Sequence, residues 1–233
     1  MLLNLDAGER DDETEALWSC FDLLAIACGG HAGDASTMNR VVGWCARNDR
    51  RIAAHPSYPD RAGFGRRTIA IDPAALAASL AEQLAALVAV AQQHGAAIEW
   101  LKPHGALYHD ANRDPALARI VIDTAIQVLG PVGVIGPPSG TLREVAESFE
   151  LPYAREGFAD RRLYPDGTLV PRSEPDALLT DPAAAAAQAR ALATRVDTIC
   201  IHGDTPNALA IARAVRGQIQ VAQVPMSSHR TST

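Results

Sequence analysis

The sequence lacks the clusters of basic residues with which proteins bind nucleic acid. Its formal net charge is −6, with 21 Lys and Arg residues against 27 Asp and Glu residues. Because phosphate binding draws on clustered Lys and Arg, this balance argues against nucleic acid as the main partner. The adjacent arginine pairs are isolated and more typical of solvated turns: Arg50-Arg51, Arg66-Arg67 and Arg161-Arg162.

The sequence also lacks paired cysteines and targeting segments. None of the four cysteines, Cys20, Cys28, Cys45 and Cys200, forms a C-x-x-C pair, so we expect reduced, mostly buried thiols rather than a zinc knuckle or redox pair. The first residues carry no basic region before Asp6, which argues against a signal peptide. No apolar run approaches the ~20 residues of a membrane helix, so we expect a cytoplasmic protein with no membrane partner.

Two common phosphate-binding loops are missing as well. The sequence contains neither Gly-x-x-x-x-Gly-Lys-Ser/Thr nor Gly-x-Gly-x-x-Gly after a strand. Gly63-Phe64-Gly65 is too short for a phosphate cradle, and we interpret it as a structural turn. The chain alone is therefore not expected to hydrolyse ATP.

A β/α alternation is what the sequence does contain. Short apolar runs end abruptly in polar or Gly-rich segments, and helical periodicity follows most of them. Strands are predicted at 2–5, 23–27, 51–54, 98–101, 132–135, weakly at 151–154, and at 198–201. Seven strands in 233 residues predict one α/β domain, a TIM-like (β/α) barrel over residues 1–220, with 221–233 as a flexible tail.

Helix starts are marked by acidic residues followed by proline. Asp72-Pro73, Asp114-Pro115 and Asp181-Pro182 each place an N-cap carboxylate before a proline at the first helical position. Thr205-Pro206 is expected to open a further helix, and Gly95 to end the one that begins at Pro73.

Polar side chains follow most of the predicted strands. In a β/α barrel the C-terminal ends of all strands meet at one face, where active sites form. A single strand-end histidine more often stabilises a loop, and Asp34 or Asp204 could merely cap a turn or helix. Four strand-end histidines, His31, His55, His104 and His202, instead favour a shared functional face.

Several segments are distinctive as an ordered set: NLDAGE, IACGGHAGD, AHPSYPD followed by GFGRR, KPHGALY, FADRR with DGTLVPR, and IHGDTP. In this order and at these spacings they resemble the LamB/YcsF family, the A subunits of 5-oxoprolinase, over nearly the whole chain. The resemblance implies a barrel of the glycoside hydrolase/deacetylase type. It also implies ATP-driven cleavage of 5-oxoproline to L-glutamate with partner subunits B and C, which would use or share the ATP.

A chemical scheme for opening the lactam, in which the partners activate its oxygen and this chain hydrolyses the intermediate, assigns roles to individual residues. We expect Asp6 or Glu9 to act as general base on water, and Lys102 with His104 to stabilise the oxyanion. Arg66 or Arg161 would hold the substrate carboxylate. The full substrate-binding set is expected to comprise Asn4, His31, Asp34, His55, Tyr58, Arg66, Tyr108, Arg161, His202 and Asp204.

Other interpretations of the same residues stay open. Asp6, His55 and His104 could hold a divalent metal that activates water, although no H-x-x-x-H spacing supports it. The chain could be a stand-alone metal-dependent deacetylase or amidase, or a non-catalytic scaffold for partner subunits. A homo-oligomer is also left open.

Overall fold

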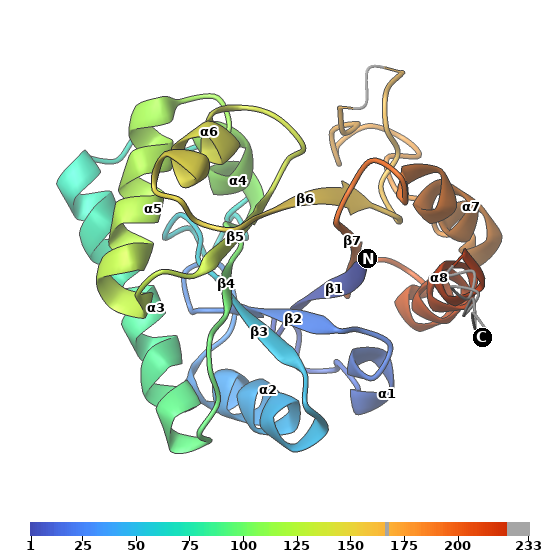
Figure 1. Cartoon of the computed structure of the whole chain (residues 1–233), viewed down its shortest axis with the longest axis horizontal. Coiled ribbons are helices and arrows are strands. Elements are labelled where there is room, and N and C mark those ends of the chain that lie inside the picture. The colour runs from blue at the N-terminus through green and yellow to red at the C-terminus, as the bar shows by residue number, and fades with distance from the viewer. Residues whose placement is uncertain (166–167, 223–233) are drawn as a thin grey trace, which may run out of the picture.

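Seven parallel strands close into a barrel in the computed structural model, which describes residues 1–165 and 168–222, without the side chains of 220–222. The strands follow one another in chain order, and the first pairs with the last (Figure 1). They are β1 (Leu2–Ala7), β2 (Leu23–Ala27), β3 (Arg51–His55), β4 (Trp100–Leu101), β5 (Gly133–Gly136), β6 (Tyr153–Phe158) and β7 (Thr198–His202). The predicted TIM-like barrel is confirmed.

Helices surround the barrel on its outside (Figure 1). They are α1 (Glu15–Trp18), α2 (Ala35–Asn48), α3 (Pro73–Gln93), α4 (Gly105–Ala111), α5 (Pro115–Leu129), α6 (Thr141–Ser148), α7 (Pro182–Leu192) and α8 (Ala208–Ala222). The carboxylates of Asp72, Asp114 and Asp181 accept hydrogen bonds from the first backbone N–H groups of α3, α5 and α7. The predicted helix starts are therefore confirmed at all three positions.

The last helix begins later than expected. α8 starts at Ala208 rather than at Thr205-Pro206, because the Thr205 hydroxyl donates to Asp160 across 2.5 Å and Asn207 takes a φ of 65°. The helix continues to Ala222. The predicted tail thus starts no earlier than residue 223, and 223–233 lie outside the described residues.

α3 corrects the expectation that no apolar run approaches membrane-spanning length. Its 21 residues are long and apolar enough to cross a bilayer by length and composition alone. Leu76, Leu80, Leu84 and Leu87 are buried on its inner side, and the helix packs against α2 and α5. A helix that packs on the outside of a barrel can also be this long and apolar. In α3 most of the remaining surface is alanine rather than charged residues.

β6 lies further along the chain than the weak strand predicted at 151–154. Arg155 and Glu156 make the β6 sequence more polar than a typical buried strand. Each of the two has an oppositely charged partner, on opposite sides of the strand. Arg155 Nε lies 2.8 Å from Asp197 Oδ2 in a partly exposed pair. Glu156 Oε1 lies 2.9 Å from Lys102 Nζ in the barrel interior.

The barrel interior is apolar in one sector and polar in another. Strands β2 to β6 contribute a small buried cluster made of strand residues: Leu23, Ala25, Ala53, Ile135 and Ala154, with Trp100 packed against it. Buried Asn4, Asp6, Glu156 and Thr198 come instead from β1, β6 and β7. This polar sector continues into the candidate site.

Candidate active site

Asp6 and Asn4 point into the barrel, as side-chain alternation along β1 predicts. Both meet the side chain of Lys102, which is 2% exposed. Lys102 Nζ lies 2.9 Å from Asn4 Oδ1 and 2.6 Å from Asp6 Oδ1, and 2.9 Å from Glu156 Oε1. An ammonium group has three hydrogens to donate, and Lys102 Nζ donates to Asn4 Oδ1, Asp6 Oδ1 and Cys200 Sγ while it forms an ion pair with Glu156.

Opposite charges keep this buried pair ionised. Burial alone would lower the pKa of Lys102, but the neighbouring Asp6, Cys200 and Glu156 raise it well above its usual value. Burial alone would raise the pKa of Asp6, but His55 and Lys102 bring it well below its usual value. Lys102 therefore fixes the charge and position of Asp6, and this geometry favours a positioning role over the oxyanion role expected from the sequence.

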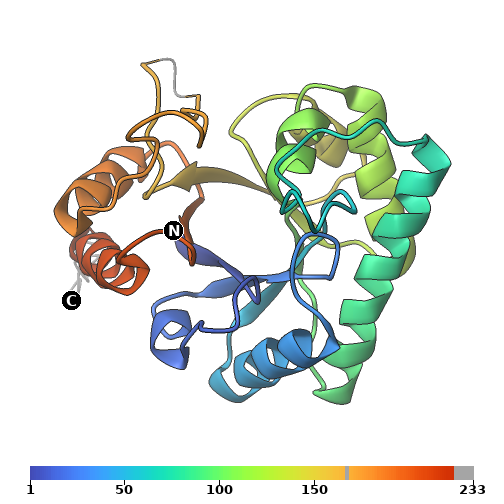
Figure 2. The same cartoon turned by 180° about the vertical axis from the view of Figure 1, so that it is seen from behind.

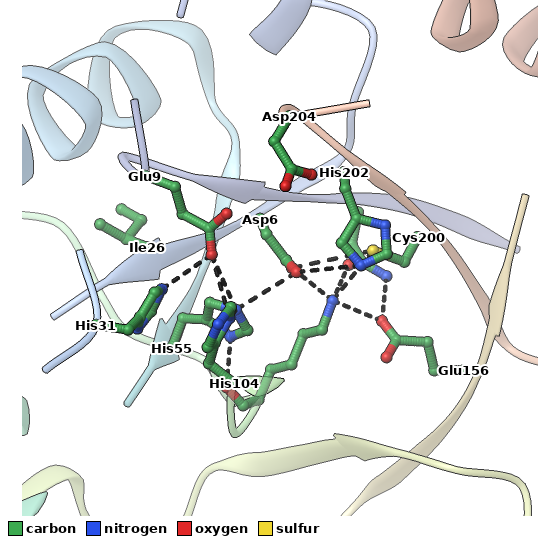
Figure 3. A network of polar contacts seen from close by, with 12 residues as sticks. Asp6, Glu9, Ile26, His31, His55, His104, Glu156, Cys200, His202 and Asp204 are labelled. Atoms are coloured by element: carbon green, nitrogen blue, oxygen red, sulfur yellow. Dashed lines mark hydrogen bonds and ion pairs between the residues drawn. The ribbon is translucent and has the colours of Figure 1, made fainter. Parts of the chain in front are cut away.

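Three histidines converge on the carboxylate of Glu9 (Figure 3). Glu9 Oε1 lies 2.9 Å from His31 Nε2, 3.1 Å from His104 Nδ1 and 3.8 Å from His55 Nε2. The rings of His31 and His104 stack with centroids 3.6 Å apart. Burial lowers the pKa of His31 to about 3 and also lowers that of His104, so both rings are neutral near pH 7.

Backbone carbonyl groups fix two of these rings. His55 Nδ1 donates to Lys102 O across 2.7 Å, and His104 Nε2 donates to Phe64 O across 2.9 Å. Gly65 lets the Phe64 carbonyl approach, because a Cβ at that position would lie 2.9 Å from His31 Cβ. The Gly63-Phe64-Gly65 segment is thus a turn, as interpreted from the sequence, and it supports His104.

His202 is held by a buried carboxylate on the other side of the site. Asp160 Oδ1 lies 3.0 Å from His202 Nδ1, and Asp160 Oδ2 accepts from the backbone N–H of His202 and from the Thr205 hydroxyl. Burial would raise the pKa of Asp160, but His202 and Thr205 lower it. This arrangement leaves His202 Nε2 facing Asp6 Oδ2 at 3.9 Å, as the base of a Ser-His-Asp triad is oriented.

Arginines gather around Asp204 beside His202. Asp204 Oδ2 lies 2.5 Å from Arg66 Nη2 and 2.9 Å from Arg172 Nη1. Arg161 lies close enough to Arg66 and Arg172 for their positive charges to act on it. Burial, and then repulsion from Arg172, lowers the pKa of Arg161 to about 10. Three guanidinium groups against the two carboxylates of Asp204 and Asp160 leave an excess of positive charge, which suits an anion.

The structure brings together most of the residues expected to form the site. The predicted convergence of the four histidines on one face is confirmed by their contacts with Glu9 and Asp6. In Figure 2 the chain between β3 and α3 passes in front of the barrel, and this segment includes Phe64, Gly65 and Arg66.

Three expected residues form no hydrogen bond or ion pair with the Glu9 and Asp6 carboxylates in the part of the chain that the structure describes. Asp34 is exposed and caps α2, although it also lines a cavity of about 520 Å³ next to Glu9 and His31. Tyr58 donates to Asp110 Oδ2 across 3.1 Å. Tyr108 is buried with its ring 6.1 Å from that of Phe158. Their substrate-binding roles stay predictions.

Glu156, Cys200 and Asp160 have no role in the sequence-based account. Cys200 Sγ lies 3.2 Å from Lys102 Nζ. Thr198, Cys200 and His202 alternate along β7 as Asn4 and Asp6 do along β1. This alternation could have predicted that Cys200 points into the barrel. Glu156 gives no such signal, since the sequence pattern places the strand that carries it too early in the chain.

Among the residues that the structure describes, two groups of side chains could hold a metal ion. One contains Glu9, His31, His55 and His104, and the other contains Asp6, Cys200 and His202; within each group the ligand atoms lie within 4.8 Å of one another. The set expected from the sequence, Asp6, His55 and His104, is therefore divided between the two.

Comparisons with known proteins agree over nearly the whole chain. The LamB/YcsF family profile matches residues 3–233. The A subunit of 5-oxoprolinase from Streptomyces avermitilis is 40% identical over 247 residues, covering 97% of this chain and 98% of the relative. That of Methylococcus capsulatus is 38% identical, covering 97% of this chain and 94% of the relative.

Solved structures give the same result. The crystal structure of the lactam utilization protein from Thermus thermophilus is 32% identical, with a TM-score of 0.86 over 95% of this chain and 96% of that one. SacUVDE has a TM-score of 0.51 at 11% identity, over 96% of this chain and 100% of that one, which is a likeness of fold alone.

Proposed function

The chain belongs to the LamB/YcsF family, and we propose that it is the A subunit of an ATP-dependent 5-oxoprolinase, which opens 5-oxo-L-proline to L-glutamate. The relatives that carry this name cover nearly the full length of the chain. The structural observation that carries the proposal is the meeting of Asp6, His202 and an arginine cluster at one end of the barrel. Such a site combines groups for proton transfer with a binding place for a carboxylate.

The arginine cluster fits the substrate's one carboxylate. A guanidinium group binds a carboxylate through two parallel hydrogen bonds. Arg161 Nε is buried and has no hydrogen-bond partner among the described residues. Arg161, with Arg66 and Arg172 beside it, would therefore anchor the substrate, while Asp204 holds the latter two in place.

Hydrolysis of the lactam requires the attacking water to lose a proton and the ring nitrogen to gain one. Asp6 is ionised, and its Oδ2 lies too far from His202 Nε2, at 3.9 Å, for a hydrogen bond between them. His202 Nε2 is therefore available to the reactants, and Asp6 Oδ2, which lies 3.4 Å from His55 Nε2, can still accept a hydrogen bond from a water molecule. Asp6 would orient the water, and His202 would take its proton and return it to the nitrogen, with Asp160 stabilising the imidazolium.

ATP is proposed to be used by the partner subunits B and C, or at an interface shared with them, because this sequence has no recognisable phosphate loop. The partners would activate the lactam oxygen, and this chain would hydrolyse the activated intermediate. The buried free thiols Cys28, Cys45 and Cys200 fit a reducing cytoplasm.

The test is reconstitution from separately purified subunits. Glutamate formation and ATP consumption are measured with all three subunits and with this chain left out. We expect 5-oxoproline-dependent glutamate only in the full mixture and no appreciable ATP turnover by this chain alone. Undiminished glutamate formation without the chain would contradict the proposal.

The cluster of three histidines and Glu9 favours one second candidate, a stand-alone metal-dependent amidase or deacetylase. Turnover of an amide by the pure chain, without ATP or partners and abolished by a chelator, would support that candidate instead. A scaffold role fits less well, because a protein that only supports assembly has no need for this buried polar site.

A further inference from the structure

We propose that Glu9, His31, His55 and His104 bind one divalent transition-metal ion, with Zn²⁺ as the best fit. Each residue offers one ligand atom, and the four atoms lie within 4.8 Å of one another. Three imidazoles and one carboxylate form a ligand set suited to zinc and its first-row neighbours rather than to Mg²⁺ or Ca²⁺. The inference concerns the isolated chain and does not depend on the proposed activity.

The orientation of His55 and His104 carries the proposal. A carbonyl oxygen can only accept, so His55 Nδ1, bonded to Lys102 O, and His104 Nε2, bonded to Phe64 O, must carry the ring hydrogens. When a ring carries only this hydrogen, its other nitrogen holds a lone pair. Those nitrogens, His55 Nε2 and His104 Nδ1, face each other at 3.0 Å. Two lone pairs at this separation require a cation between or beside them, either a proton or a metal ion.

The Glu9 carboxylate oxygen Oε1 supplies a third lone pair beside His55 Nε2 and His104 Nδ1. Its Oε1 lies 3.1 Å from His104 Nδ1 and 3.8 Å from His55 Nε2, and its side chain is 2% exposed. A tetrahedral ion with bonds of about 2.0–2.1 Å separates its ligand atoms by about 3.3 Å. The observed separations lie on either side of that value, so small movements of the side chains suffice for coordination.

The outer nitrogens of the rings match those of metal-bound histidines. Such ligands usually donate their second N–H to a carboxylate or backbone carbonyl, which fixes the tautomer. His55 and His104 both do so. His31 does not, because its Nδ1 is buried without a partner among the described residues. We therefore expect His31 to contribute least to affinity.

Lys102 argues against the neighbouring group as the metal site. Its ammonium nitrogen lies 2.6 Å from Asp6 Oδ1 and 3.2 Å from Cys200 Sγ. A metal ion bound to Asp6 and Cys200 would meet this positive charge directly. The two halves of the site thus hold different cations, an ammonium group beside Asp6 and a metal ion beside Glu9.

The experiment uses the full chain, freed of metal with a chelator and then dialysed against Zn²⁺. Metal content is measured by mass spectrometry and the melting temperature is recorded with and without Zn²⁺. A second sample is loaded with Co²⁺, whose visible absorption is strong only when the ion leaves water for a site of low coordination number. We expect one ion per chain, a higher melting temperature with Zn²⁺, and a visible Co²⁺ spectrum.

Variants identify the ligands. Glu9→Gln and His104→Gln should each bind Zn²⁺ at least about 10-fold more weakly. Loss of a residue that only hydrogen-bonds to a metal ligand already weakens metal binding by about that factor. Asp6→Asn should keep the ion, which separates this set from the one that includes Asp6. His94→Gln is the matched control, since His94 follows α3 and bonds to Asn39.

Two results would overturn the proposal. One is a parent chain that takes up no Zn²⁺ and shows no Co²⁺ spectrum, which would mean that His55 and His104 share a proton instead. The other is unchanged Zn²⁺ affinity in folded Glu9→Gln and His104→Gln chains. Because the parent's Co²⁺ spectrum needs no variant, misfolding of a variant does not prevent a decision.

Discussion

Asp6 and Lys102 form a buried ion pair in the barrel, with Oδ1 and Nζ 2.6 Å apart. The pair joins the end of β1 to the residue that follows β4. Glu156 shares the same ammonium group, so the three charges sum to −1 in a region from which water is largely excluded. Replacing Lys102 and replacing Asp6 should therefore lower the free energy of unfolding by different amounts.

Lys102→Met should destabilise the fold far more than Asp6→Asn. The methionine leaves two buried carboxylates without their cation, and breaking a buried pair in this way costs about 3–5 kcal/mol. Asp6→Asn leaves Lys102 paired with Glu156 and should cost less. Urea unfolding gives both free energies of unfolding, and equal losses would show that Glu156 does not share the charge.

His202→Gln should lose most activity in the reconstituted complex while the protein stays folded. Glutamine cannot take up a proton near neutral pH, and general acid or base help contributes roughly 10²- to 10⁴-fold. The rate of glutamate formation and the melting temperature are measured together. A variant that melts like the parent and keeps more than about half its rate, outside any such effect, would remove His202 from the chemistry.

Asp160→Asn should destabilise the protein in a pH-dependent way. The pKa of Asp160 is lowered in the fold, so its carboxylate contributes stability that is present above the unfolded value of about 3.9 and is lost as pH falls through the folded value. We expect a deficit of about 1–3 kcal/mol near pH 7 that narrows in acid below about pH 4. A deficit of constant size from pH 7 to pH 3 would contradict this assignment.

Gly65→Ala should disturb the histidine cluster, and Gly95→Ala provides a matched control. Both glycines have a φ of 61°, but a Cβ at Gly65 would lie 2.9 Å from His31 Cβ, whereas nothing lies within 4 Å of one at Gly95. The left-handed backbone alone costs an alanine about 1–2 kcal/mol. The difference between the two losses in chemical denaturation measures the steric effect, and no difference would show that the turn can move away.

The sequence predicted this site in part. Alternation along β1 placed Asn4 and Asp6 inside, and the phase of the four histidines placed them on one face. Sequence spacing gives no distances between side chains from different strands, so it indicates Asp6, His55 and His104 as one metal set. Only in three dimensions does Lys102 take the place of a metal beside Asp6. The sequence does not indicate Glu156, because two adjacent charged residues, Arg155 and Glu156, are untypical of a buried strand.

The central claim is that the residues at this end of the barrel perform the lactam chemistry. It is tested most directly by the rate of glutamate formation from 5-oxoproline in complexes rebuilt with Asp6→Asn or with His202→Gln. We predict complexes that assemble and consume little 5-oxoproline, with rates lowered roughly 10²- to 10⁴-fold. Folded, assembled variants that both keep more than about half of the parent rate, outside that range, would contradict the claim.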